Sequence, residues 1–124
     1  MASITTEGGI VSTAKEVNIF LKAFFNGKLF PKERVEELKV WKLLLPPPST
    51  FYFGIGLEKQ FLPRILVSPI KPIGDVMGFW GQTSAFAWYN PNTDLYFSGT
   101  ANQVSESGHT ATMRAIIDII KSAL

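Results

Sequence analysis

Two places in the sequence hold side chains whose type and spacing could do chemistry. Ser12 and Lys15 form a Ser-x-x-Lys pattern, in which a lysine one helical turn from a serine takes the proton of the nucleophilic hydroxyl. His109 is the only histidine and could serve as a base or a metal ligand. No group of carboxylates accompanies it, and we expect a lone histidine at the entry to a helix to be a surface residue.

The Ser-x-x-Lys pattern lies where a helix is expected to begin. Apolar residues recur at helical spacing between Thr13 and Asn26, and Gly27 follows as a stop signal. Thr13 and Glu16 have the spacing of a capping box, in which the threonine hydroxyl accepts from a free backbone N–H and the glutamate reaches back. Serine and threonine are common before helices for this reason alone. We therefore interpret the pattern as a helix cap rather than as a catalytic pair.

The clearest strand signals lie between Gly78 and Gln103. Large residues alternate with small or polar ones from Phe79 to Tyr89 and again from Leu95 to Ala101, with turn residues at 90–94. This pattern predicts a hairpin of two strands. On the first strand, small residues on one face let a helix or a ligand approach the backbone, and we expect a helix. That face carries Phe79, Gly81, Thr83, Ala85, Ala87 and Tyr89, and the other carries Trp80, Gln82, Ser84, Phe86 and Trp88.

Shorter elements are expected around this hairpin. A second helix is predicted for Pro31–Lys39, and three consecutive prolines after it force an extended connection. Alternation from Phe51 to Leu57 predicts one strand with an apolar face. Prolines between Phe61 and Asp75 predict a crossing loop, in which Arg64–Ser68 could be a short strand. A final helix is predicted near the C-terminus, with an apolar stripe made by Thr112, Ile116, Ile119, Ile120 and Ala123.

The order of these elements predicts an α+β fold, with an antiparallel sheet of about three to four strands and helices on its faces. A length of 124 residues and a hydrophobic content of 46% suit a single domain, residues 1–124. The formal net charge of +2, without a run of like charges, argues against nucleic acid as a partner. No stretch is apolar enough to span a bilayer. The absence of cysteine excludes a thiolate metal site, and we expect neither metal nor cofactor.

Two separate segments resemble one enzyme family. The stretch from Gly78 to Gln103 is similar to the strand and hairpin that carry the third active-site motif of serine β-lactamases, penicillin-binding proteins and related esterases. The stretch from Gly8 to Phe30 is similar to a segment of the same family in which Gly-Gly-Leu-x-Ser-Thr-Ala opens a helix that ends in Leu-x-Asn-Gly. Both matches occur in the family's order. The hairpin positions in register are Gly81, Thr83, Phe86, Tyr89, Pro91, Asp94, Leu95, Tyr96, Gly99, Thr100, Asn102 and Gln103.

The resemblance implies a partial β-lactamase/transpeptidase-like fold that covers about the last third of the family's chain. The family's own Ser-x-x-Lys lies far upstream of these segments, so the resemblance implies that no catalytic residue is in this chain. Phe79, Trp80 and Gly81 fall on the motif strand, and the backbone N–H of Gln82 falls at an oxyanion-hole position. Phe79 stands where the family has lysine or histidine and cannot transfer a proton. The resemblance therefore implies an esterase-like or inactive relative, and it leaves the location in the cell open.

The same resemblance bears on partners. In the family, strands from the start of the chain complete the sheet beside the hairpin's second strand. Without them, Leu95–Ala101 is expected to be an unpaired edge, to be covered by the missing N-terminal part of the fold or by a second copy in a homodimer. Two alternatives to a hydrolase fragment are a self-associating structural module and a non-catalytic binding module. The latter would hold an apolar ligand on Trp80, Phe86 and Trp88, a face that we expect to be core.

Overall fold

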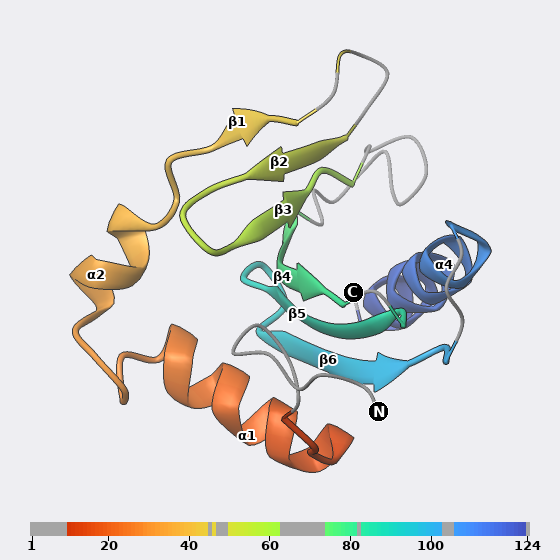
Figure 1. Ribbon diagram of the computed structural model, residues 1–124, viewed down its shortest axis with the longest axis horizontal. Coiled ribbons are helices and arrows are strands. Elements are labelled where there is room, and N and C mark those ends of the chain that lie inside the picture. The colour runs from red at the N-terminus through yellow and green to blue at the C-terminus, as the bar shows by residue number, and fades with distance from the viewer. Residues whose placement is uncertain are drawn as a thin grey trace, which may run out of the picture.

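Every strand of the sheet pairs with the next strand along the chain. The computed structural model describes residues 10–44, 46, 50–62, 74–81, 83–102 and 106–123. Within them the sheet is antiparallel and has six strands in the order β1-β2-β3-β4-β5-β6 (Figure 1). The α+β class is thereby confirmed, but the prediction of three to four strands was too low. The strands are β1 (Lys42–Leu43), β2 (Phe51–Phe53), β3 (Glu58–Gln60), β4 (Val76–Trp80), β5 (Ala85–Asn90) and β6 (Leu95–Thr100).

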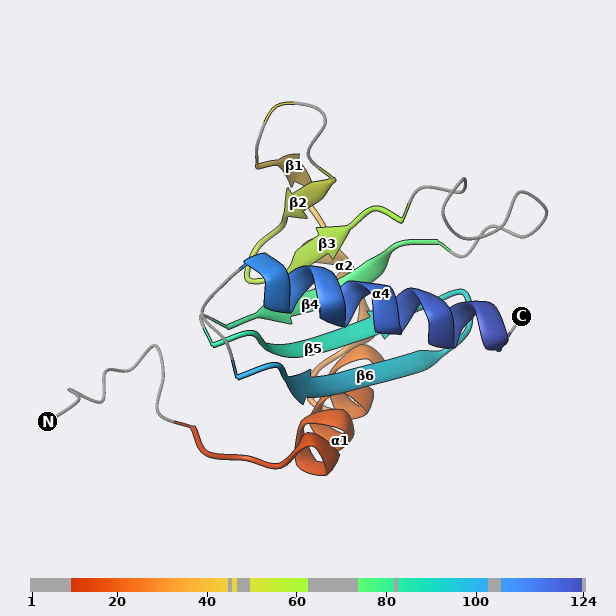
Figure 2. The same cartoon turned by 90° about the vertical axis from the view of Figure 1, so that its right-hand side faces the viewer.

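Helices cover both faces of the sheet. Helices α1 (Ala14–Phe25) and α2 (Lys32–Glu37) pack on one face, and α4 (Glu106–Ser122) lies across the other (Figure 2). The three predicted helices are confirmed, and the ends of α1 and α2 shift by only one or two residues from those predicted. In the described ranges, no helix is both long enough and apolar enough to cross a membrane.

Each face has its own hydrophobic core. The core beneath α4 consists of Leu62, Val76, Trp80, Trp88, Phe97, Met113, Ile116 and Ile120, and the core beneath α1 and α2 consists of Leu21, Phe25, Val35, Leu57 and Met77. Trp80 and Trp88 are only 8% and 0% exposed, which confirms that this aromatic face is core. On α4 the predicted stripe is confirmed at Ile116 and Ile120, whereas Ile119 is half-exposed.

The stretch Phe79–Tyr89, predicted as one strand, is two strands joined by a tight turn. Strand β4 ends at Trp80, and the Ser84 N–H, at a residue with φ of +57°, donates to the Gly81 carbonyl at 3.0 Å. Trp80 then pairs with Phe86 in β5. Cross-strand neighbours share a face, so the alternation of residue types continues through the turn without a break. The single-strand prediction was wrong for this reason, although the described side chains still divide between the two predicted faces.

The predicted strand Phe51–Leu57 also contains a turn, which joins β2 to β3. The chain leaves β2 at Gly54, whose N–H donates to the Leu57 carbonyl at 2.9 Å, and passes through Gly56 with φ of +71° before entering β3. Strand β1 was not predicted, because two residues are too short to show an alternation. The possible strand Arg64–Ser68 lies outside the described residues.

Small residues let neighbouring strands and helices approach each other closely on both faces of the sheet. Ala87 and Tyr89 of β5 pack in the core beneath α1, which confirms the helix expected over the small face. A side chain at Gly78 would collide with the carbonyl of Ala87 on the neighbouring strand. A side chain at Gly108, in the first turn of α4, would lie 2.8 Å from the Ser84 hydroxyl. Helix α4 therefore starts directly against the turn between β4 and β5.

Helix α1 begins with a complete capping box. The Glu16 N–H donates to the Thr13 hydroxyl at 3.3 Å, and the Thr13 N–H donates to the Glu16 carboxylate at 2.8 Å. The Ser12 hydroxyl donates to the same carboxylate at 3.2 Å. These hydrogen bonds, with the one from the Thr13 backbone foremost, hold the pKa of Glu16 below its ordinary value. The cap interpretation of the Ser-x-x-Lys pattern is thus confirmed.

We expect Thr13→Ala to lower the free energy of unfolding by about 1 kcal/mol, because the Glu16 N–H loses its acceptor. Urea denaturation of the variant and the unchanged protein measures the difference. Ser12→Ala is the matched control, since it removes an exposed hydroxyl that is not part of the box, and it should stay within about 0.5 kcal/mol of the unchanged protein. Equal losses for the two variants would contradict the assigned cap.

Candidate functional site

The motif strand implied by the resemblance corresponds to the end of β4 and the turn after it. Phe79 is 49% exposed on the α1 side of the sheet, whereas Trp80 is 8% exposed beneath α4. The Gly81 N–H donates to the Ala85 carbonyl at 2.7 Å, so this amide is used by the hairpin itself. Gln82 lies outside the described residues. The structure therefore places Phe79 and Trp80 on opposite faces and does not bring their side chains together.

Ser12 and Lys15 do not form a catalytic pair. Both are exposed at the start of α1, and the Ser12 hydroxyl donates to Glu16. A nucleophilic serine needs its base within hydrogen-bond reach. In the part of the chain that the structure describes, no hydrogen bond joins Ser12 to Lys15. The Glu16 carboxylate that accepts from Ser12 is a weak base, because its hydrogen bonds, with the one from the Thr13 backbone foremost, hold its pKa below the ordinary value.

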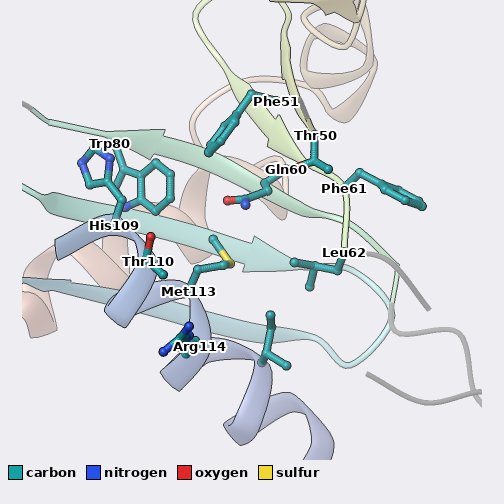
Figure 3. A pocket seen from close by; sticks show the side chains of 11 residues that line it. Thr50, Phe51, Gln60, Phe61, Leu62, Trp80, His109, Thr110, Met113 and Arg114 are labelled. Carbon is teal, nitrogen blue, oxygen red and sulfur yellow. The ribbon is translucent and has the colours of Figure 1, made fainter. Parts of the chain in front are cut away.

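His109 lies against Trp80, a pairing that the sequence did not reveal. The first turn of α4 sets its imidazole parallel to the Trp80 ring, with 4.2 Å between ring centroids and an angle of 6° (Figure 3). His109 is half-buried, so the prediction of a surface histidine was wrong. The pairing arises because the turn after β4 and the start of α4 meet at Gly108. Gly108, which precedes His109 in the sequence, is the residue from which this close approach could have been predicted.

A cavity of about 320 Å³ opens beside the stacked rings, between β2, β3 and α4 (Figure 3). Its wall is mostly apolar, and in Figure 3 the Gln60 amide extends toward the space between Trp80 and Met113. The size falls in the range of small-molecule sites. The lining residues are Thr50, Phe51, Gln60, Phe61, Leu62, Trp80, His109, Thr110, Met113, Arg114 and Ile117.

Three lining residues carry a buried polar atom without a hydrogen-bond partner among the described residues. These atoms are Oε1 of Gln60, Nε1 of Trp80 and Nε2 of His109. Buried polar atoms in native proteins are nearly always paired, so an unpaired group calls for an explanation. All three residues line one cavity, which makes this cavity the best candidate for a binding site.

The site offers no metal centre of the usual kind. Within the described residues, no three histidine, aspartate or glutamate side chains lie close enough together to hold a metal ion. His109 contacts an aromatic ring instead, and the described residues that line the cavity include no carboxylate. The arrangement favours binding of an organic molecule over metal chemistry.

Glu58 is a buried carboxylate on β3 that the sequence analysis did not single out. It lies on β3 opposite Gly78, is 8% exposed, and accepts a hydrogen bond from the backbone N–H of Trp80. Burial raises the pKa of Glu58 above its ordinary value of 4.5, and the hydrogen bond from Trp80 opposes this rise. Its Oε2 atom is buried and has no hydrogen-bond partner in the described ranges. Glu58 therefore weakens the fold when it is ionised.

Comparison of the chain with protein-family models, with curated proteins and with solved structures gives no significant match.

We expect Glu58→Gln to raise the free energy of unfolding at pH 7 and to flatten its pH dependence. Because the pKa of Glu58 is higher in the folded chain, the folded state binds more protons, and stability falls as the pH rises from 4.5 through the folded-state value. Glutamine has nearly the same shape and cannot ionise. Thermal unfolding between pH 4 and pH 8 measures the effect.

The control for loss of one negative charge is Glu33→Gln, on the exposed side of α2. Parallel pH profiles for Glu58→Gln and the unchanged protein would contradict the assigned burial cost.

Proposed function

We propose that this chain is the C-terminal sheet-and-helix part of a β-lactamase-related serine hydrolase, of the β-lactamase, D-Ala-D-Ala peptidase or esterase type, and that it is inactive alone. The observation that carries this proposal is the free edge of β6. Strand β6 ends the sheet order, and among the described residues it pairs only with β5. The resemblance implies that strands from the start of the family's chain would lie at this edge.

The backbone groups at this edge can be assigned from the pairing of β5 and β6. Ala101 donates to the Ser84 carbonyl at 3.3 Å, and hydrogen-bonded pairs alternate along an antiparallel ladder. The N–H and C=O groups of Tyr96, Ser98 and Thr100 therefore point away from β5. These groups form the template on which another strand can pair.

Two helices flank the edge and make it a groove. Asn18 of α1 lines it on one side, and Thr112 and Ile119 of α4 line it on the other, around a cavity of about 340 Å³. The Oδ1 atom of Asn18 is buried without a partner in the described part of the chain. A groove with a strand edge at its base suits an added extended strand, which pairs through its backbone.

In the proposed hydrolase, the end of β4 and the following turn form one wall of the active site. The nucleophilic serine and its lysine belong to the N-terminal part, and the backbone N–H of Gln82 is the proposed oxyanion donor. Phe79 provides apolar contact where a lysine or histidine would bind a substrate carboxylate. This difference favours an ester substrate, or an inactive relative, over a β-lactam or a D-alanyl peptide.

The cavity beside Trp80 and His109 favours a second candidate function, that of a non-catalytic module that binds a small molecule. This candidate does not need a second part of the fold, because residues of this chain line the cavity.

We expect the chain alone to show no serine-dependent turnover of a chromogenic cephalosporin or a nitrophenyl ester, because the Ser12 hydroxyl donates to the helix-capping Glu16 and no hydrogen bond joins it to Lys15 among the described residues. The positive test is to read the coding sequence upstream of Met1 for Ser-x-x-Lys and Tyr-x-Asn and to express the longer chain. Hydrolysis that is lost when the upstream serine becomes alanine would support the proposal. Absence of both motifs upstream, or turnover by the chain alone that is lost in Ser12→Ala, would overturn it.

When expressed alone, the chain should form a homodimer through two antiparallel β6 edges, because identical edges can pair about a two-fold axis. Sedimentation velocity at micromolar concentration measures the mass, and hydrogen exchange measures protection of the Tyr96, Ser98 and Thr100 amides. The amides that bond to β5, such as that of Gly99, provide the internal control. A 13.8 kDa monomer with rapid exchange at the three outward amides would contradict this assembly.

A further inference from the structure

We propose that the cavity between β2, β3 and α4 binds a small planar aromatic carboxylic acid that carries a hydrogen-bond donor on its ring. This binding site is separate from the strand edge of β6 and does not depend on the proposed hydrolase relationship. Three features of the cavity support the assignment: its aromatic and sulfur-containing wall, the guanidinium of Arg114, and buried polar atoms that have no hydrogen-bond partner among the described residues.

The wall of the cavity suits a flat aromatic body. Phe51 and Trp80 both line the cavity, and their rings lie 5.6 Å apart at an angle of 48°. Met113 lies opposite them and adds a polarizable sulfur, which makes favourable contacts with aromatic rings. Leu62 and Ile117 complete the apolar lining. A bound aromatic ring could pair with Phe51 or Trp80 in an offset-stacked or edge-to-face arrangement, and it would bury apolar surface against Leu62 and Ile117.

The charge at the cavity wall favours a single negative charge on the ligand. Arg114 is exposed on α4 and lines the cavity, and no ion pair involves its guanidinium within the described ranges. The described lining residues include no carboxylate that would repel an anion. A guanidinium offers two parallel N–H groups that match a carboxylate. One arginine therefore selects a monocarboxylate over a neutral molecule of the same shape.

The side chain of Gln60 favours a ligand that carries a hydrogen-bond donor on its ring. Oε1 of Gln60 is an acceptor that is buried without a partner among the described residues, and Figure 3 shows its amide directed toward the space between Trp80 and Met113. Rotation about the terminal bond of the glutamine turns this oxygen toward a ligand. A phenolic hydroxyl or a ring N–H would then complete a hydrogen bond that the protein leaves unmade.

The test is a nuclear magnetic resonance titration at pH 7 with 4-hydroxyphenylacetate as the probe. We expect saturable shifts that are largest at the indole N–H of Trp80, which lines the cavity, and small at that of Trp88, which does not. The neutral amide of the same acid, 4-hydroxyphenylacetamide, should bind about tenfold more weakly, because it lacks the charge that pairs with Arg114. Phenylacetate, which lacks the hydroxyl, should also bind more weakly than the probe.

Two variants and a control locate the binding site. Arg114→Gln should weaken binding of the acid about tenfold and leave binding of the amide unchanged. Arg34→Gln removes an exposed arginine of α2 and should change neither affinity. Ile117→Trp should fill the cavity and abolish binding of both ligands, with circular dichroism to confirm that the variant is folded.

The proposal is overturned if the acid gives no saturable shift, if acid and amide bind equally, or if Arg34→Gln weakens the acid as much as Arg114→Gln does. Should Ile117→Trp fail to fold, the comparison of the two arginine variants still decides the outcome.

Discussion

The structure depends on burial of β4 and β5 on both of their faces. Trp88 and Val76 are fully buried on the α4 side, and Met77 is buried on the α1 side. Burying a large aliphatic side chain contributes about 1.5–3 kcal/mol relative to leaving it exposed, so neither layer of helices can be removed without a large loss of stability. Gly78 is part of the same constraint, because a side chain there would push the two central strands apart.

Local signals in the sequence predicted the helices and the C-terminal hairpin. The capping box at Thr13 and the helical spacing of apolar residues in α1 involve residues within a few positions of each other in the sequence, and both predictions are confirmed. Strand β6 was also predicted closely, because the turn before it contains Asn90, Pro91 and Asp94. The predicted number of strands was wrong. At Gly81 and Gly54 the chain turns within an unbroken alternation, since residues that face each other across a hairpin lie on the same side of the sheet.

The candidate site could not be predicted, because its residues come from elements that are distant in sequence. His109 contacts Trp80 only because α4 begins at the turn after β4. Glu58 alternated with apolar residues in the sequence, as a solvated strand residue would, yet it is buried between Gly78 and the backbone of Trp80. Of the residues that the resemblance placed on the motif strand, Trp80 lines the cavity, whereas Phe79 is exposed on the opposite face. Only the packing of α4 shows that the cavity lies on the other face.

The order of the strands has a kinetic consequence. All five strand pairings among the described residues join neighbours in the chain, and the longest connection between two of them is residues 61–75. A meander of this kind can form step by step. Contacts between α1 and β6, by contrast, join residues that are far apart in the sequence. The Ser98 hydroxyl donates to the Ala14 carbonyl, 84 residues away, and the Asn26 side chain donates to the Tyr96 hydroxyl, 70 residues away. Docking of α1 onto β6 therefore closes the longest loops among these contacts, so we expect the face of the sheet that α1 covers to be shielded from water late in folding.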